Sequence, residues 1–206
     1  MNTFVLHAAE PVVVDTGLSL PDRGFMDALG SAVGADDVRW IWLTHRDRDH
    51  TGALFELLAA APGARVVTTF LGAGIMSAER PLPMDRVHLL DPGQSLDVGG
   101  RTPAGFRPPL SDDPATVGFF DTATRTCSSS DCFGAPVPSA GLATCDDGAA
   151  VPADGLRAGQ LLRATVSGTL RPSRAAPSSR SWPSRRPGCR RRARPPGRAP
   201  RRGPAR

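Results

Sequence analysis

The sequence has no lysine, no tyrosine and only one asparagine, whereas alanine, glycine, proline and arginine are abundant. This composition is typical of a GC-rich coding sequence and carries no information on function. There is also no run of about 18 consecutive apolar residues, which excludes a membrane-spanning helix. The N-terminus has no basic stretch followed by an apolar run and a cleavage site. These absences predict a soluble, cytoplasmic protein with no membrane partner.

Closely spaced cysteine pairs are absent as well. The chain of 206 residues has four cysteines and none of them forms a CxxC motif: Cys127, Cys132, Cys145 and Cys189. A disulfide framework and a zinc ribbon both need closer or more regular spacing. The four cysteines are therefore predicted to be free, buried thiols.

Acidic residues are absent from the last quarter of the chain. Residues 1–154 contain all 20 acidic side chains and 10 arginines, a net charge of −10, whereas residues 155–206 contain 15 arginines and no acid. From about Arg171 onward the sequence is mostly arginine, proline, serine, glycine and alanine, which cannot form a core. We predict one domain over residues 1–167 and a disordered Arg/Pro-rich tail over residues 168–206.

The basic tail has two interpretations. Its arginines can bind nucleic acid or another polyanion nonspecifically by neutralising phosphates. Alternatively, it is a solvated tail or the product of out-of-frame or read-through translation. The second interpretation is favoured because only Trp182 offers an aromatic ring for stacking.

Apolar runs and turn residues predict alternating strands and helices over the first part of the chain. Helices are expected at residues 21–33 and 54–61, where apolar side chains recur at helical spacing. The run 38–43 predicts a strand buried on both faces. Further strands are expected at residues 4–6, 11–14, 66–69, 87–90, 101–106, 117–121 and 125–129. This order predicts a layered α/β domain with mixed sheets, in which His88 is a packed strand residue.

A charged loop follows the buried strand and carries His45, Asp47, Asp49 and His50. Imidazole nitrogens and carboxylate oxygens bind zinc or iron, and alternate residues of one loop can reach two metals about 3.5 to 4 Å apart. The pattern HxDxDH arises by chance in a chain of this composition about 5 times in 10,000, which disfavours coincidence. The alternative is a solvated turn whose arginines neutralise the aspartates. In the metal-binding interpretation, Arg46 and Arg48 point outward.

The order of motifs resembles the metallo-β-lactamase superfamily. A strand leads to Asp-Thr-Gly at residues 15–17, and the charged loop ends in Thr-Gly at residues 51–52. The loop of that superfamily is typically HxHxDH, and Asp47 replaces its second histidine. A carboxylate there is similar to the HxExDH loop of the flavodiiron and oxygen-binding di-iron proteins, as are NTFVL at residues 2–6 and SSDCFG at residues 129–134. The resemblance implies an αββα sandwich.

The resemblance also implies a set of metal-site residues: His45, Asp47, Asp49, His50, Asp112 and Asp131, with Asp15 behind a ligand histidine. Asp131 corresponds to the carboxylate that bridges two metals, and Asp112 occupies the place of a family histidine. From the residues alone, Asp112 and Asp131 are equally well explained as turn residues. The last histidine of the chain is His88, so the family's final histidine ligand has no counterpart. A second metal should therefore bind weakly.

The resemblance covers residues 1–167 and does not extend to the flavodoxin-like domain of flavodiiron proteins. We therefore expect a C-terminally truncated or frameshifted relative whose sandwich is incomplete at its C-terminal end. Its carboxylate-rich site favours two metal ions, iron before zinc or manganese.

Three functions follow from this site. The first is binding or reduction of oxygen or nitric oxide, with an external redox partner as electron donor. The second is hydrolysis of a small-molecule ester, thioester or phosphate. The third is an inactive relative that lacks the last ligand.

Overall fold

The computed structural model describes residues 2–18, 24–111, 113–139, 141, 154, 155, 157 and 159. The predicted ligand Asp112 and the predicted tail at residues 168–206 lie outside these residues, as do Cys145 and Cys189. Of the two cysteines that are described, Cys127 is exposed and Cys132 is buried. The prediction of buried thiols is therefore confirmed for Cys132 and wrong for Cys127. Among the described residues, no helix has the length and hydropathy needed to cross a membrane.

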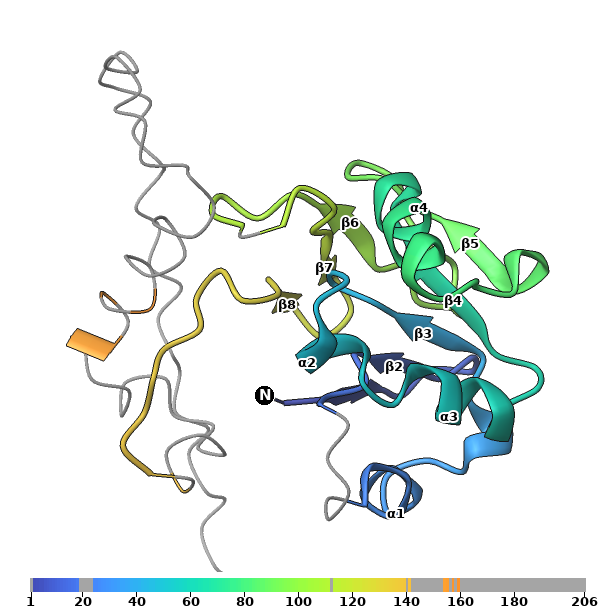
Figure 1. Cartoon of the computed structure of the whole chain (residues 1–206). Helices are drawn as coiled ribbons and strands as arrows, with labels where there is room; N and C mark the ends of the chain where they lie inside the picture. The colour runs from blue at the N-terminus through green and yellow to red at the C-terminus, as the bar shows by residue number, and fades with distance from the viewer. Residues whose placement is uncertain are drawn as a thin grey trace, which may run out of the picture. The chain divides into compact units, whose positions relative to one another are not determined.

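A five-stranded sheet forms the centre of the fold (Figure 1). Its strands lie in the order in which they occur: β1 (Phe4–Leu6), β2 (Val12–Val14), β3 (Trp40–Trp42), β4 (Arg65–Thr68) and β5 (Val87–Leu89). β1 is antiparallel to β2, and β2 through β5 are parallel. The carboxyl ends of four strands therefore share one edge of the sheet, where loops can bring side chains together.

Helices cover one face of this sheet. The helices are α1 (Phe25–Gly30), α2 (Arg48–Thr51), α3 (Leu54–Ala60) and α4 (Phe70–Glu79), with short 3-10 turns at Ala35–Asp37 and Met84–Arg86. Alternate strand residues, such as Val13 and Ile41, pack against Leu29 of α1 and Leu57 of α3 in one buried cluster. Because successive side chains of a strand point to opposite faces, their neighbours face the other way.

The opposite face packs against a second sheet. This sheet is antiparallel and consists of β6 (Ala104–Phe106), β7 (Gly118–Asp121) and β8 (Thr126–Ser128). Trp42 of β3 meets Phe119 of β7, with ring centroids 4.9 Å apart, inside a buried cluster that includes Val12 and Val67. The predicted layered α/β fold is confirmed, and of the predicted αββα sandwich the described residues form one helical layer and both sheets. The prediction that β3 is buried on both faces is also confirmed.

Two helices were not predicted, α4 and the short α2, which lies within the predicted charged loop. Helix α4 contains Gly72 and Gly74, which disfavour helix formation. The structure shows why it forms: Thr69 caps the helix by accepting a hydrogen bond from the backbone N–H of Gly72 at 3.0 Å. A Cβ on Gly72 would lie 2.6 Å from Oγ1 of Thr68. Glycine here therefore allows the helix to approach the end of β4 closely.

His88 lies half-buried in β5 with its ring edge-on to Trp40, at a centroid distance of 5.5 Å, which confirms its prediction as a packed strand residue. Burial lowers its pKa, and the nearby charge of Arg65 lowers the pKa further. His88 is therefore a neutral packing residue, well suited as a control for the histidines of the charged loop.

A buried ion pair ties the two sheets together at their other end. Asp121 is fully buried in β7 and accepts hydrogen bonds from Arg101 and Thr124, and Arg101 also donates to the carbonyl of His7 after β1. The bond from Arg101 lowers the pKa of Asp121 to about 2, against the opposing effect of burial. The position of Asp121 therefore favours the charged carboxylate.

We expect this ion pair to give an acid-dependent contribution to stability. The pKa of Asp121 is lower in the folded chain than its ordinary value of 3.8, so the contribution is complete above that value and is lost as the pH falls towards 2. Arg101→Ala should cost roughly 3 kcal/mol at neutral pH because Asp121 keeps an unpaired buried charge. Urea unfolding of both proteins at pH 7 and pH 2.5 checks this, since the deficit should shrink at the lower pH. An equal deficit at both values contradicts the prediction.

Candidate metal centre

The carboxyl ends of β2 and β3 bring the candidate residues together. Asp15 directly follows β2, and the charged loop directly follows β3 and leads into the short helix α2. The backbone N–H of Val117, next to β7, donates to the carbonyl of Thr44 at 2.8 Å, so the second sheet also reaches this edge. Residues from both sheets therefore surround one point.

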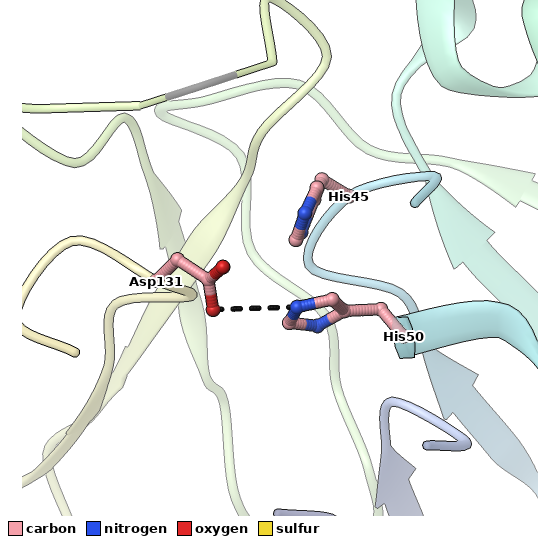
Figure 2. Close-up of side chains that lie close together, drawn as sticks. All are labelled: His45, His50 and Asp131. Atoms are coloured by element: carbon pink, nitrogen blue, oxygen red, sulfur yellow. Dashed lines mark ion pairs between the residues drawn. The ribbon is translucent and has the colours of Figure 1, made fainter. Parts of the chain in front are cut away.

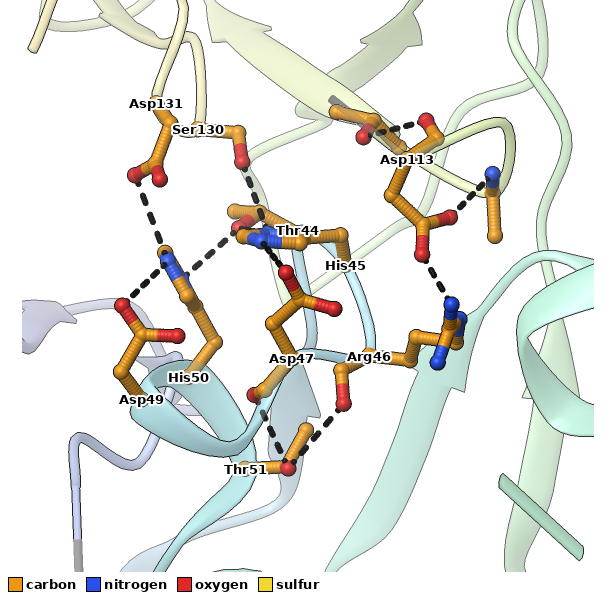
Figure 3. A network of polar contacts seen from close by, with 12 residues as sticks. Thr44, His45, Arg46, Asp47, Asp49, His50, Thr51, Asp113, Ser130 and Asp131 are labelled. Atoms are coloured by element: carbon orange, nitrogen blue, oxygen red, sulfur yellow. Dashed lines mark hydrogen bonds and ion pairs between the residues drawn. The ribbon is translucent and has the colours of Figure 1, made fainter. Parts of the chain in front are cut away.

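His45 and His50 are buried side by side at this point. Each residue is only 2% exposed, and their ring centroids are 3.9 Å apart. His45 lies in the loop before α2, and His50 lies within the helical turn, which begins after Asp47. The turn brings the second imidazole back beside the first, as Figure 3 shows.

Asp15 fixes the orientation of His50. One carboxylate oxygen of Asp15 lies 2.8 Å from Nδ1 of His50, and the carboxylate also accepts hydrogen bonds from the backbone N–H and the hydroxyl of Thr44 at 2.7 and 2.8 Å. Asp15 has a φ of +57°, a left-handed conformation in which aspartate is enriched among non-glycine residues. A carboxylate that accepts from Nδ1–H leaves Nε2 with its lone pair free to bind a metal.

Ser130 occupies the corresponding position behind His45. Its hydroxyl oxygen lies 3.0 Å from Nδ1 of His45, and its φ is +54°. Sequence reasoning did not assign a role to Ser130. The available signal was its position directly before Asp131 in the SSDCFG segment. Both histidines thus have a partner at Nδ1 and direct Nε2 towards the centre of the site.

Asp131 completes a group of three potential ligands, drawn in Figure 2. One ligand atom from each of His45, His50 and Asp131 lies within 4.8 Å of the other two. Nε2 of His50 is 3.3 Å from a carboxylate oxygen of Asp131. Within the described residues, Nε2 of His45 and Nε2 of His50 are buried without a hydrogen-bond partner. Because such atoms cost about 1 to 3 kcal/mol each, this arrangement fits a bound cation.

Asp47 and Asp49 lie at the outer rim of this group. Asp47 is 3.6 Å from Nε2 of His45, and Asp49 is 3.8 Å from Nε2 of His50 (Figure 3). Their side chains are 46% and 43% exposed, so they can move towards an ion. The structure therefore brings together all the predicted site residues except Asp112, which lies outside the described residues.

The two carboxylates that face His50 favour a positive charge there. Burial alone lowers the pKa of His50, but Asp131 and Asp15 outweigh burial and raise the pKa to about 10. The same negative potential that favours an imidazolium also favours a divalent cation.

Arg46 corrects one expectation from the sequence. It does not point outward: its Nε lies 2.7 Å from a carboxylate oxygen of Asp113, a residue that is 2% exposed. Arg48 is exposed, as predicted. The charge pattern of the loop cannot reveal a partner that lies in a distant segment of the sequence, so this pair was missed.

The fold and the site together define a two-sheet α/β protein with a histidine- and carboxylate-rich cluster at the common edge of its sheets. Residues 2–128 match the family model described as the metallo-beta-lactamase superfamily. The chain belongs to this superfamily.

Curated relatives place the chain near the flavodiiron proteins, which confirms the resemblance noted in the sequence. It is 26% identical over 134 residues to the anaerobic nitric oxide reductase flavorubredoxin of Enterobacter sp. (strain 638), covering 65% of this chain and 28% of that protein. The corresponding protein of Aeromonas hydrophila is 25% identical over 134 residues, covering 65% of this chain and 27% of the relative. The chain thus spans about a quarter of the length of these relatives.

Solved structures show the same fold. The rubredoxin oxygen:oxidoreductase of Desulfovibrio gigas superposes with a TM-score of 0.62 at 19% identity, covering 68% of this chain and 35% of that one. The metal-soaked Flv1 flavodiiron core of Synechocystis superposes with a TM-score of 0.63 at 19% identity, covering 76% of this chain and 39% of that one.

Proposed function

We propose that this chain carries a carboxylate-rich dinuclear metal centre that binds or reduces dioxygen or nitric oxide with electrons from an external donor. The observation that carries the proposal is the convergence of two buried imidazoles on Asp131, with both Nε2 atoms lacking a hydrogen-bond partner among the described residues.

The distances support a division of the ligands between two ions. His45 and Asp47 form one neighbouring pair, and His50 and Asp49 form the other. We assign Asp131 to both ions, because one of its ligand atoms lies within 4.8 Å of ligand atoms from both histidines. Asp112 stays a proposed ligand of the first ion. The second ion is then held by fewer groups and should bind more weakly.

The donor set favours iron, with zinc or manganese as alternatives, because oxygen-rich ligation suits harder cations. When bound, two iron ions would supply the redox chemistry and open positions for a diatomic ligand. The chain itself orients the imidazoles through Asp15 and Ser130 and buries both rings away from solvent. The names of the relatives, nitric oxide reductase and rubredoxin oxygen:oxidoreductase, support nitric oxide and dioxygen as substrates. They also support a separate protein as electron donor.

Metal loading tests this proposal. Anaerobic incubation with Fe²⁺ and removal of excess metal should leave two iron ions per chain, with the second lost first on titration with a chelator. The loaded chain should consume nitric oxide when a chemical reductant is supplied, and His45→Ala should retain neither iron nor activity. Elemental analysis and a nitric oxide electrode give the two measurements. A wild-type chain that binds no metal would identify an inactive relative and end the proposal.

A second candidate is metal-dependent hydrolysis of an ester, thioester or phosphate, which the superfamily match over residues 2–128 favours. A metal pair can lower the pKa of a bound water to near neutrality. The zinc-loaded chain would then cleave members of an ester panel and lose this activity in Asp49→Ala. Polyanion binding by residues 168–206 and the domain boundary at residue 167 stay predictions.

A further inference from the structure

We infer that the ion pair between Arg46 and Asp113 positions the metal-binding loop and keeps Asp113 out of the ligand set. This inference rests on the proposed metal centre. It concerns two residues for which neither the loop motif nor the resemblance gives a role, and it makes Arg46 a positioning residue.

The carboxylate of this ion pair is buried, whereas the arginine side chain is partly exposed. Asp113 has a side chain that is 2% exposed, and Arg46 has one that is 33% exposed. One oxygen of Asp113 lies 2.7 Å from Nε of Arg46, and the other accepts a hydrogen bond from the backbone N–H of Ala115 at 2.6 Å. Both oxygens therefore already face a group of the protein: one forms the ion pair with Arg46, without hydrogen-bond geometry, and the other accepts the hydrogen bond from Ala115.

The segment that carries Asp113 is itself anchored to the end of β3. The backbone N–H of Val117 donates to the carbonyl of Thr44 at 2.8 Å, and the indole N–H of Trp42 donates to the carbonyl of Val117 at 3.1 Å. Thr69 adds a bond from its hydroxyl to the carbonyl of Ala115 at 3.2 Å. These hydrogen bonds fix the position of the segment that carries Asp113, so an ion pair with Asp113 can restrain the charged loop.

Arg46 lies between His45 and Asp47 in the chain. Its ion pair with Asp113 therefore restrains the positions of both proposed ligands. Behind it, the hydroxyl of Thr51 donates to the carbonyls of Arg46 and Asp47 at 3.3 and 3.0 Å. Figure 3 shows this arrangement, with Arg46 directed towards Asp113 and away from the histidines. The loop is therefore held by two contacts: the ion pair of Arg46 with Asp113, and the hydrogen bonds from Thr51 to the loop's own carbonyls.

Positioning and simple electrostatics predict opposite effects. Removing Arg46 makes the surroundings of the cation more negative, which by itself strengthens metal binding. If Arg46 positions the loop, its removal weakens binding, because loss of the groups that orient metal ligands typically costs 10-fold to 100-fold in affinity. The direction of the change therefore distinguishes the two roles.

The experiment is an anaerobic titration of the full chain with Co²⁺, followed by calorimetry and by the visible absorption of the bound ion. The variants are Arg46→Met, Asp113→Asn and the double variant, with Arg48→Met as the matched control on the same loop. We expect about 10-fold to 100-fold weaker binding and an altered cobalt spectrum in each single variant. The double variant should show a similar loss rather than the product of two losses, because it removes the same interaction.

The double variant also separates folding from positioning. It restores the wild-type net charge and leaves no unpaired charge in the buried position of Asp113, so it should fold even if Arg46→Met does not. Binding in the double variant that equals the wild type, or equal effects of Arg46→Met and Arg48→Met, overturns the inference. A wild-type chain that binds no Co²⁺ overturns the proposed metal centre instead.

Discussion

His50→Ala should lower the affinity of the chain for Fe²⁺ or Co²⁺ by more than about 100-fold, because it removes a ligand rather than a group that merely orients one. His50 is the most connected side chain of the site. It lies 2.8 Å from Asp15, 3.3 Å from Asp131 and 3.8 Å from Asp49. No other described side chain of the group contacts three carboxylates. Metal titration of the purified variant gives the measurement.

His88→Ala is the matched control for this experiment. His88 packs against Trp40 in β5, so its loss also removes a partly buried imidazole. It should reduce thermal stability without changing metal affinity. If His88→Ala and His50→Ala weaken metal binding equally, the effect comes from general destabilisation, and the assignment of His50 as a ligand fails.

Much of the candidate site could be predicted because its information is local in the sequence. His45 and His50 follow an apolar run that predicts a buried strand, and their spacing in the HxDxDH pattern is typical of metal ligands. Asp15 was predicted from the family resemblance and not from strand order. The structure gives the physical reason for its position: it follows β2, which is parallel to β3, and parallel strands bring their carboxyl ends to one edge.

The contacts that could not be predicted are those between distant segments. Arg46 reads as a solvated charge until the fold places Asp113 beside it. Ser130 has no assigned role in the sequence until the segment after β8 brings it against His45. Helix α4 shows a different limit, because its glycines lower the local helix preference. Close packing against Thr68 explains Gly72, whereas no contact explains Gly74. The sequence therefore located the ligand candidates and Asp15, but not the roles of Ser130 and Asp113.

Backbone strain is concentrated where these holding groups act. Within the described residues, three non-glycine residues have positive φ: Asp15, Ser130 and Arg125. Two of the three contact Nδ1 of a site histidine, and Arg125 lies in the turn between β7 and β8. Such conformations cost of order 1 to 3 kcal/mol each and persist where surrounding contacts enforce them. The fold thus accepts strain at the two positions that aim the imidazoles.

Asp15→Asn is expected to weaken metal binding by about 10-fold to 100-fold while leaving most of the stability intact. Asparagine tolerates positive φ and can still accept the hydrogen bond from the backbone N–H of Thr44. Its amide can also donate to Nδ1 of His50, and the proton would then reside on Nε2, where a metal cannot bind. Titration with Co²⁺ and urea unfolding measure the two effects separately.

Asp15→Ala should lose both stability and metal affinity. Alanine is strained at a φ of +57° and leaves the buried N–H and hydroxyl of Thr44 without their acceptor, so roughly 3 kcal/mol of stability should be lost in addition to metal affinity. Asp97→Asn provides the control, since Asp97 is exposed and accepts a hydrogen bond from the backbone of Gly99 at 3.0 Å. It should bind Co²⁺ like the wild type. If Asp15→Asn also binds like the wild type, the carboxylate of Asp15 does not set the proton position on His50, and the buried contact between them serves folding alone.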